Sequence, residues 1–303
     1  MRFILGSGII GYLAKTLFPD WQWIPFKRSR YFSFDVPYAD NFMTFDKEVD
    51  EFMCKVSAKN NTKIFMKRPF SYNGQLMYQE NSLTRDPYLL HLYGETAPRL
   101  ADTTLKTTFA IYPMTVKQLH DYYYQQLRNQ IDESINRYGE VQAFDLEKRT
   151  IRTSTGTFEF EQIISTIPLN AFCQLSGRQT KLKALPVNYY LIESKKVDIE
   201  GADQVLVCDN NIEFFKVQKV DGLYQFWCAE ILEKPYDYFG SVLGFDFDLK
   251  EARRITDVIP TGEQPDLSEL EKVGVFCVGS NAQWDDLMGV TSCLKRLLKL
   301  RGK

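Results

Sequence analysis

The chain has 303 residues, of which 44% are hydrophobic and 25% are charged, and its formal net charge is −2. These values are typical of a globular protein with a core large enough for two lobes. The small net charge argues against a protein that coats nucleic acid without sequence preference, and no apolar run reaches membrane-spanning length. We therefore expect a cytoplasmic protein with neither a signal peptide nor a membrane anchor.

The cysteines and histidines exclude two kinds of site. The six cysteines are scattered without C-x-x-C spacing, so we expect reduced thiols rather than a disulfide framework. The only histidines are His91 and His120, too few for a histidine-based metal centre. His120 falls in a long predicted helix, whereas His91 falls in a less regular segment, so His91 is the candidate catalytic base.

A glycine motif follows the first predicted strand. The apolar run Arg2–Leu5 leads into G-x-G-x-x-G, and apolar residues at helical spacing follow. The first glycine permits a tight turn, the second lets the backbone approach a pyrophosphate, and the third lets the helix pack on the strand. The alternative is a glycine-rich turn in an ordinary βα unit. The candidate binding residues are Gly6, Ser7, Gly8, Ile9, Ile10 and Gly11.

The acidic residue that usually follows the second strand is missing. We expect that strand at 22–26, so it ends at Phe26, where an Asp or Glu would hold the ribose hydroxyls. The basic residues Lys27, Arg28 and Arg30 come next. They are either phosphate ligands or part of a solvated loop.

Two further regions have regular patterns. Apolar and aromatic spacing predicts a helix over Val116–Tyr138, then a strand over Val141–Asp145 in a small antiparallel unit that extends to residue 160. A buried strand follows in Gln162–Leu169 and is interrupted at Pro168. Near the end, an apolar strand over Val273–Gly279 precedes a polar turn at 280–286 and a helix over Leu287–Leu300.

The segment between these regions has the alternation of an antiparallel sheet. Strands are expected at 187–192, 204–208, 212–217 and 223–229. Their aromatic residues are either sheet core or the wall of a substrate pocket, where they would hold an amine by cation–π contact or stack on a sugar or base. Lys216 lies in the middle of one strand and faces either water or the substrate. The candidate wall residues are Tyr190, Phe215, Tyr224 and Trp227.

Four segments together resemble, in order and character, the FAD-binding segments of the amine oxidase superfamily, which includes UDP-galactopyranose mutases and protoporphyrinogen oxidase-like proteins. They are Ile4–Gly11, Val141–Asp145, Gln162–Leu169 and Phe276–Val290. The resemblance implies an α/β protein with a discontinuous Rossmann-like FAD-binding domain and a mostly antiparallel substrate domain. The implied bounds are 1–70, 110–183 and 270–303 for the first domain, and 71–109 and 184–269 for the second.

The same resemblance implies roles for single residues. The backbone of Val141 would meet the adenine, the last helix would begin beside the flavin ring, and Lys216 would correspond to the lysine that some flavin amine oxidases place near the reactive flavin nitrogen. Phe26 and Ser280 depart from the family pattern. Outside the glycine motif, the implied cofactor residues are Lys27, Arg28, Val141, Thr166, Pro168, Gly279, Ser280, Trp284, Leu287, Met288 and Val290.

The favoured function is therefore FAD-dependent oxidation of an amine or amino-acid-like group, on a small-molecule or conjugated substrate. Three alternatives stay open. A sugar-nucleotide mutase would need arginines in the substrate lobe, and strand 212–217 has only Lys216. An enzyme of modified nucleic-acid bases would need a basic groove around Lys63, Lys67, Arg68 and Arg85. The third alternative is a non-catalytic nucleotide-binding protein, and the oligomeric state is left open.

Overall fold

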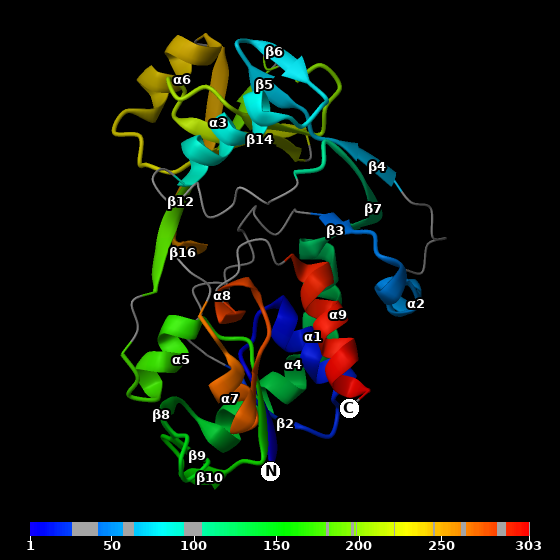
Figure 1. Cartoon of the computed structure of the whole chain (residues 1–303), viewed down its shortest axis with the longest axis vertical. Helices are drawn as coiled ribbons and strands as arrows, with labels where there is room; N and C mark the ends of the chain where they lie inside the picture. Colours follow the sequence, from blue (N-terminus) through cyan, green and yellow to red (C-terminus); the bar gives the residue numbers. More distant parts are fainter. Residues whose placement is uncertain are drawn as a thin grey trace. The chain divides into compact units, whose positions relative to one another are not determined.

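The computed structural model describes residues 1–25, 42–56, 64–93, 105–179, 182–194, 197, 199–220, 222–244, 246–261, 265–283 and 289–302. Over these ranges the chain is a mixed α/β protein that divides into two compact units (Figure 1). Unit 1 comprises residues 1–63, 112–182 and 264–303, and unit 2 comprises 64–111 and 183–263. No helix in the described ranges has both the length and the apolar character needed to cross a membrane.

Unit 1 is built on a parallel sheet with the strand order β17-β11-β1-β2. Helix α1 connects the adjacent parallel strands β1 and β2, which gives the βαβ unit expected from the sequence. The elements of unit 1 are β1 (Arg2–Leu5), α1 (Ile9–Leu17), β2 (Gln22–Ile24), β3 (Phe42–Thr44), α2 (Lys47–Val56), α4 (Val116–Tyr138), β8 (Val141–Asp145), β9 (Thr150–Thr153), β10 (Thr157–Glu159), β11 (Gln162–Ser165), α5 (Leu169–Leu175), α7 (Ser268–Lys272), β17 (Val275–Cys277), α8 (Ser280–Gln283) and α9 (Val290–Arg301).

Helices α1, α4 and α9 share one core with this sheet. Leu13, Leu119 and Leu294, one from each helix, are fully buried in the same cluster as Ile4 and Ile164 of the sheet. Figure 1 shows α9, in red, beside α1, in blue. Burial of such leucines and isoleucines contributes about 1.5–3 kcal/mol each, so this three-helix layer is a main source of the stability of unit 1.

The long helix α4 has the predicted bounds because both ends carry strong local signals. Thr115 and Gln118 form a reciprocal capping box at the start, where each side chain accepts a hydrogen bond from the backbone N–H of the other residue. Gly139 follows the last turn with φ of +65°, a conformation that glycine adopts without strain.

The segment after β17 differs from the expected polar turn. Gly279 has φ of +136°, and its carbonyl accepts a hydrogen bond from the N–H of Gln283. The chain therefore passes at once into the short helix α8. The last helix begins at Val290 with Gly289 as its N-cap, and residues 284–288 lie outside the described part.

Unit 2 is built on a sheet with the strand order β16-β12-β15-β14-β13-β5-β6, in which β5 and β13 are the one parallel pair. All four strands expected between 187 and 229 are present, with ends shifted by a few residues. The elements of unit 2 are β4 (Ile64–Lys67), β5 (Phe70–Tyr72), β6 (Gln75–Met77), α3 (Ser82–Tyr93), β7 (Thr108–Thr115, which continues into unit 1), β12 (Lys183–Ser194), β13 (Gln204–Val207), β14 (Phe214–Val220), β15 (Leu223–Cys228), α6 (Pro235–Leu243) and β16 (Phe247–Thr261).

Helix α6 covers one face of this sheet. Its Phe239 is fully buried and packs edge-on against Tyr190 of β12 and at a tilt against Phe226 of β15. Helix α3 packs against the β5, β13 and β14 end of the sheet, where Tyr88 contacts Phe70. Different helices therefore pack on the two faces of this sheet.

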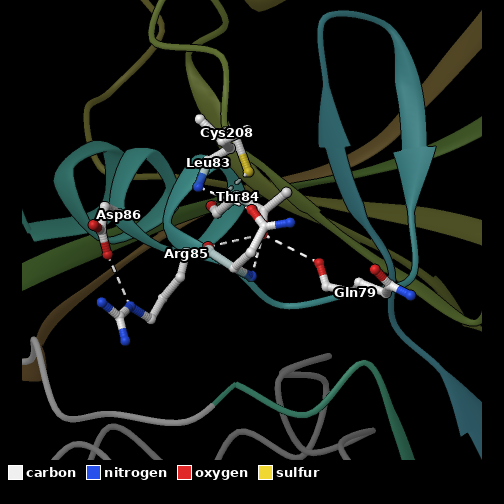
Figure 2. A network of polar contacts seen from close by, with 7 residues as sticks. Gln79, Leu83, Thr84, Arg85, Asp86 and Cys208 are labelled. Atoms are coloured by element: carbon white, nitrogen blue, oxygen red, sulfur yellow. Dashed lines mark hydrogen bonds and ion pairs between the residues drawn. The ribbon is translucent and has the colours of Figure 1, made fainter.

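The segment 88–93, expected to be less regular, is wholly helical in α3, although the helix contains Pro87. A proline has no N–H to donate to the carbonyl four residues earlier, so it weakens a helix from within. The carbonyl that Pro87 leaves without this donor is that of Leu83. The adjacent carbonyl of Thr84 accepts a hydrogen bond of 3.1 Å from the thiol of Cys208, which ties α3 to the sheet (Figure 2). Burial raises the pKa of that thiol to about 12, so it stays protonated.

The N-terminus of α3 yields the first prediction. Asn81 Oδ1 accepts a hydrogen bond from the N–H of Leu83, and Thr84 Oγ1 accepts one from the N–H of Asn81. We expect Asn81→Ala to destabilise unit 2 by about 1 kcal/mol, and Asn81→Asp to restore most of the loss, because an aspartate caps equally well. Thermal unfolding of the variants checks this, and equal melting temperatures for wild type and Asn81→Ala would disprove the capping role.

Candidate cofactor and substrate site

Three strands of unit 1 end together at one edge of the parallel sheet. Leu5 of β1 pairs with Ser165 of β11, which in turn pairs with Cys277 of β17. The residues that follow these strand ends are Gly6, Thr166 and the Val278–Gly279 pair. The structure thus brings together three of the sequence segments predicted to bind a cofactor, at the carboxyl edge where open parallel sheets bind ligands.

The turn at this edge requires glycine at two positions. Gly6 has φ of +107°, and a Cβ atom there would overlap the hydroxyl of Thr166. A Cβ atom on Gly11 would overlap the carbonyl of Gly6, so α1 packs directly on the end of β1. A Cβ atom on Gly8, in contrast, would meet no atom within 4 Å. The second glycine of the motif therefore faces open space in the described structure.

Hydrogen bonds from neighbouring strands hold the turn in place. The indole N–H of Trp23 donates to the carbonyl of Gly6 at 2.8 Å, and this bond is buried. The hydroxyl of Thr166 donates to the carbonyl of Leu5, also at 2.8 Å. Trp23 was not singled out in the sequence. Its position near the end of the second apolar strand is the only signal for it, and that signal does not distinguish an anchor from a core residue.

The N-terminus of α1 is suited to an anion. Gly8 is the N-cap and offers no side-chain hydrogen bond, and the first turn contains no acidic residue. The first N–H groups of a helix lack carbonyl partners inside that helix, and its dipole favours negative charge there. Together with the space at Gly8, this terminus fits a phosphate group.

Among the described residues, no strand pairs with the outer edge of β8. It lies at the edge of the sheet β10-β9-β8. Glu140 exchanges hydrogen bonds with Ser154 of the neighbouring chain segment. Because backbone groups alternate in direction along an antiparallel strand, the N–H and C=O of the next residue, Val141, are directed away from β9. These groups are therefore available to a ligand.

The remaining predicted cofactor residues either lie outside the described residues or stand at the start of a helix. Lys27, Arg28, Trp284, Leu287 and Met288 lie outside the described residues, as does Phe26. Ser280 is the first residue of α8, and Val290 is the first residue of α9. Pro168 is the N-cap of α5.

The four aromatic residues predicted to form a substrate wall lie on different faces of unit 2. Tyr190 and Tyr224 belong to the hydrophobic cluster under α6, and the hydroxyl of Tyr190 accepts a hydrogen bond from the N–H of Leu232. Phe215 is buried at an irregularity of β14. Trp227 lies on the other face of the sheet, where it pairs with Lys216. The sheet brings together only these last two candidates.

Lys216 does not face water freely. It is half-buried, and its Nζ lies 3.8 Å from the centre of the Trp227 ring. Burial, with a smaller effect from the positive charge of Arg68, lowers the pKa of Lys216 to about 7. In the described part of the chain, no carboxylate forms an ion pair with this lysine. Shifted and unpaired lysines of this kind are typical of functional sites.

The other polar candidates have structural partners. His91 Nδ1 lies 3.0 Å from the carbonyl of Val207, so this histidine joins the last turn of α3 to β13. Of the basic residues considered for nucleic acid, Arg85 is paired with Asp86, Arg68 binds the carbonyl of Lys106, and Lys63 lies outside the described residues.

No protein-family model matches the sequence, and no curated protein matches it significantly. Solved structures do match its fold. A reduced UDP-galactopyranose mutase superposes with a TM-score of 0.65 at 10% identity, covering 99% of this chain and 93% of the other. Cyclohexylamine oxidase from Brevibacterium oxydans IH-35A gives 0.59 at 9% identity, covering 99% and 97%. Glycine oxidase from Bacillus cereus ATCC 14579 gives 0.53 at 9% identity, covering 99% and 94%.

The resemblance drawn from the sequence named UDP-galactopyranose mutases and amine oxidases, and a UDP-galactopyranose mutase and a cyclohexylamine oxidase share this fold, so the resemblance is confirmed at the level of the fold. At this identity the likeness concerns the fold alone. The roles of individual residues have to be argued from the geometry above.

The glycine turn gives a matched pair of variants. Gly11→Ala should destabilise unit 1 by roughly 1–3 kcal/mol, because its methyl group would overlap the Gly6 carbonyl. Gly8→Ser should be neutral or slightly stabilising, because Gly8 has extended backbone angles, its surroundings are open, and serine is a favourable N-cap. Thermal unfolding of both proteins checks the prediction, and equal losses in the two would contradict this geometry.

The lowered pKa of Lys216 predicts that the stability of the folded protein depends on pH. Its pKa falls from 10.5 in the unfolded chain to about 7 in the folded one, so between these values the unfolded chain binds the extra proton. Stability is therefore lost as the pH falls from 10.5 to 7, and the whole penalty is present below pH 7. Lys216→Met should remove this penalty and stabilise the protein at pH 6 by about 1–2 kcal/mol, a modest value because the side chain is only half-buried.

Melting temperatures at pH 6 and pH 10 provide the measurement, with Lys219→Met as the control because Lys219 is exposed on the same strand. The gain from Lys216→Met should be smaller at pH 10. A variant less stable than wild type at pH 6 would show that the ammonium group is stabilised by its surroundings.

Proposed function

We propose that this chain is an FAD-dependent oxidoreductase acting on an amine or amino-acid-like group. The observation that carries the proposal is the glycine turn at the carboxyl edge of the parallel sheet, with open space at Gly8 and an uncapped α1. Support comes from the shared fold, since two of the neighbours are named as a cyclohexylamine oxidase and a glycine oxidase.

Unit 1 would hold the cofactor along its carboxyl edge. The N–H groups at the start of α1 would bind the pyrophosphate, and the outward backbone groups of Val141 would bind the adenine. Gly279 and the start of α9 at Val290 would lie at the flavin end, where a helix N-terminus stabilises negative charge on the ring system. By the resemblance, Lys27, Arg28, Ser280, Trp284, Leu287 and Met288 complete this site.

When bound, the flavin would accept two electrons from a substrate C–H next to nitrogen, giving an imine, and would pass them to oxygen to form hydrogen peroxide. The protein would supply binding, orientation and charge. Such a reaction requires few acid–base side chains, which agrees with a chain that has only two histidines.

Of the two candidate catalytic residues, Lys216 has the environment of a substrate-contacting group. Its amine is half-buried against Trp227 and is without an acidic partner in the described structure. Nδ1 of His91 lies 3.0 Å from the carbonyl of Val207, a contact that favours a structural role joining α3 to the sheet over a catalytic one. We assign unit 2 as the substrate unit on the basis of this lysine.

The test begins with the absorption spectrum of the purified protein and the mass of any released chromophore. The expected result is a flavin spectrum and the mass of FAD. Gly8→Ser should weaken FAD binding by about tenfold or more, because the serine fills the space at Gly8 and its hydroxyl caps the N–H groups that would meet the phosphates.

The melting temperature of the Gly8→Ser apoprotein serves as the control, and it should equal or slightly exceed that of the wild-type apoprotein. A colourless wild-type protein that also fails to bind added FAD would refute the proposal. Turnover of amines with release of hydrogen peroxide separates an oxidase from a mutase, which produces no net redox change.

A further inference from the structure

One face of the unit 2 sheet carries an unusual set of polar groups. Strand register places Phe70, Leu206, Lys216 and Trp227 in one row across β5, β13, β14 and β15. Residues directly paired across strands share a face, so this row lies on the side opposite the cluster under α6. The neighbouring row on the same face carries glutamines.

Three buried glutamines form a chain of hydrogen bonds across these strands. Gln204 Nε2 donates to Gln218 Oε1 at 2.8 Å, and Gln218 Nε2 donates to Gln225 Oε1 at 2.6 Å. The chain ends at Gln225 Nε2, which is buried and has no acceptor among the described residues. Gln225 lies two residues before Trp227, so the unused donor belongs to the same face as Lys216.

Trp227 presents a second unused donor. Its side chain is 5% exposed, and its indole N–H is buried without an acceptor in the described structure. A buried donor left unpaired costs about 1–3 kcal/mol, so native proteins rarely keep one without a reason. Two such donors on adjacent positions of one face indicate that an acceptor from outside the described chain belongs there.

Two positively charged side chains near these donors also require a negatively charged partner. Lys216 lies over Trp227, and the positive charge of Arg68 acts on it. Arg68 donates to the carbonyl of Lys106 and lies over the ring of Phe109, and Glu80 is the acid whose charge acts on it. No carboxylate in the described structure forms an ion pair with either cation.

We propose that Arg68, Lys216, Gln225 and Trp227 form a donor patch that binds a carboxylate of the substrate. The inference rests on the proposed function, and it narrows the substrate from amines in general to amines that also carry a carboxylate. A carboxylate accepts hydrogen bonds at both oxygens, so it satisfies the unused donors and neutralises Lys216 at once. A bare ammonium group does neither, and the two cations repel it.

The test measures binding of benzoate to the purified holoenzyme by calorimetry at constant ionic strength, with the neutral isostere benzamide and inorganic phosphate as comparison probes. Wild type should bind benzoate at least tenfold more tightly than benzamide. Lys216→Met should remove this preference, while Lys219→Met, which changes an exposed lysine on the same strand, should keep it.

Trp227→Phe tests the unused donor separately, because it deletes the indole N–H and keeps an aromatic ring beside Lys216. It should weaken benzoate binding by roughly tenfold, the usual effect of losing a hydrogen bond to a charged group, and leave benzamide binding unchanged. Equal binding of benzoate and benzamide by wild type would overturn the proposal. Tighter binding of phosphate than of benzoate would overturn its assignment to a carboxylate.

Turnover then links the donor patch to the reaction. Phenylalanine and phenethylamine differ by one carboxylate, so wild type should give the higher kcat/KM with phenylalanine, and Lys216→Met should reduce that preference at least tenfold. A wild-type preference for phenethylamine would contradict the inference. Benzoate binding needs neither flavin nor turnover, so a protein that binds benzoate but no FAD refutes the proposed function alone, and one with FAD but no benzoate preference refutes the donor patch alone.

Discussion

The direct packing of Gly11 on the carbonyl of Gly6 is the constraint on which unit 1 depends. With no Cβ atom between them, α1 approaches β1 closely enough to share a core with α4 and α9. The same approach aims the first turn of α1 at the carboxyl edge of the sheet. The buried indole of Trp23 then fixes the carbonyl that Gly11 contacts. One backbone turn therefore determines both how α1 packs on the sheet and where its N-terminus would meet a ligand.

Elements with local signals could be predicted from the sequence. Helix α4 has a capping box at one end and a glycine at the other, so its bounds follow from nearby residues alone. Helix α3 was missed because Pro87 weakens the local pattern, and the contacts that fix the helix on the sheet come from distant residues, such as the hydrogen bond from Cys208 to the carbonyl of Thr84, 124 residues away. The short helix α8 was missed because Gly279 starts it through an unusual φ angle that composition does not reveal.

The candidate site likewise has one part that could be predicted from the sequence and one part that could not. The glycine motif is local, so its spacing predicted a turn whose geometry fits its expected role. The environment of Lys216 depends on which strands pair and on an irregularity at Phe215, neither of which the sequence reveals. From alternation alone, a lysine in the middle of a strand more often faces water. The aromatic residues predicted to form one wall lie on two faces of the sheet, because the sequence does not reveal how the strands pair.

The sheet of unit 2 has one face of ordinary core and one face that folding alone would not favour. A half-buried ammonium and two donors that have no acceptor among the described residues oppose folding, whereas the cluster around Phe239 favours it. A protein keeps such groups when they serve a ligand, and their cost then appears as reduced stability of the unliganded state.

The interleaving of the two units has a consequence for synthesis of the chain. In unit 1, Thr166 bonds to Leu5 from 161 residues away, and Thr291 bonds to Thr44 from 247 residues away. Unit 2 likewise needs both of its stretches. Neither unit can close while the ribosome is still making the first half of the chain, and the strands waiting for partners present open edges. A nascent chain of this protein is therefore expected to need chaperone protection until helix α9 has been synthesised.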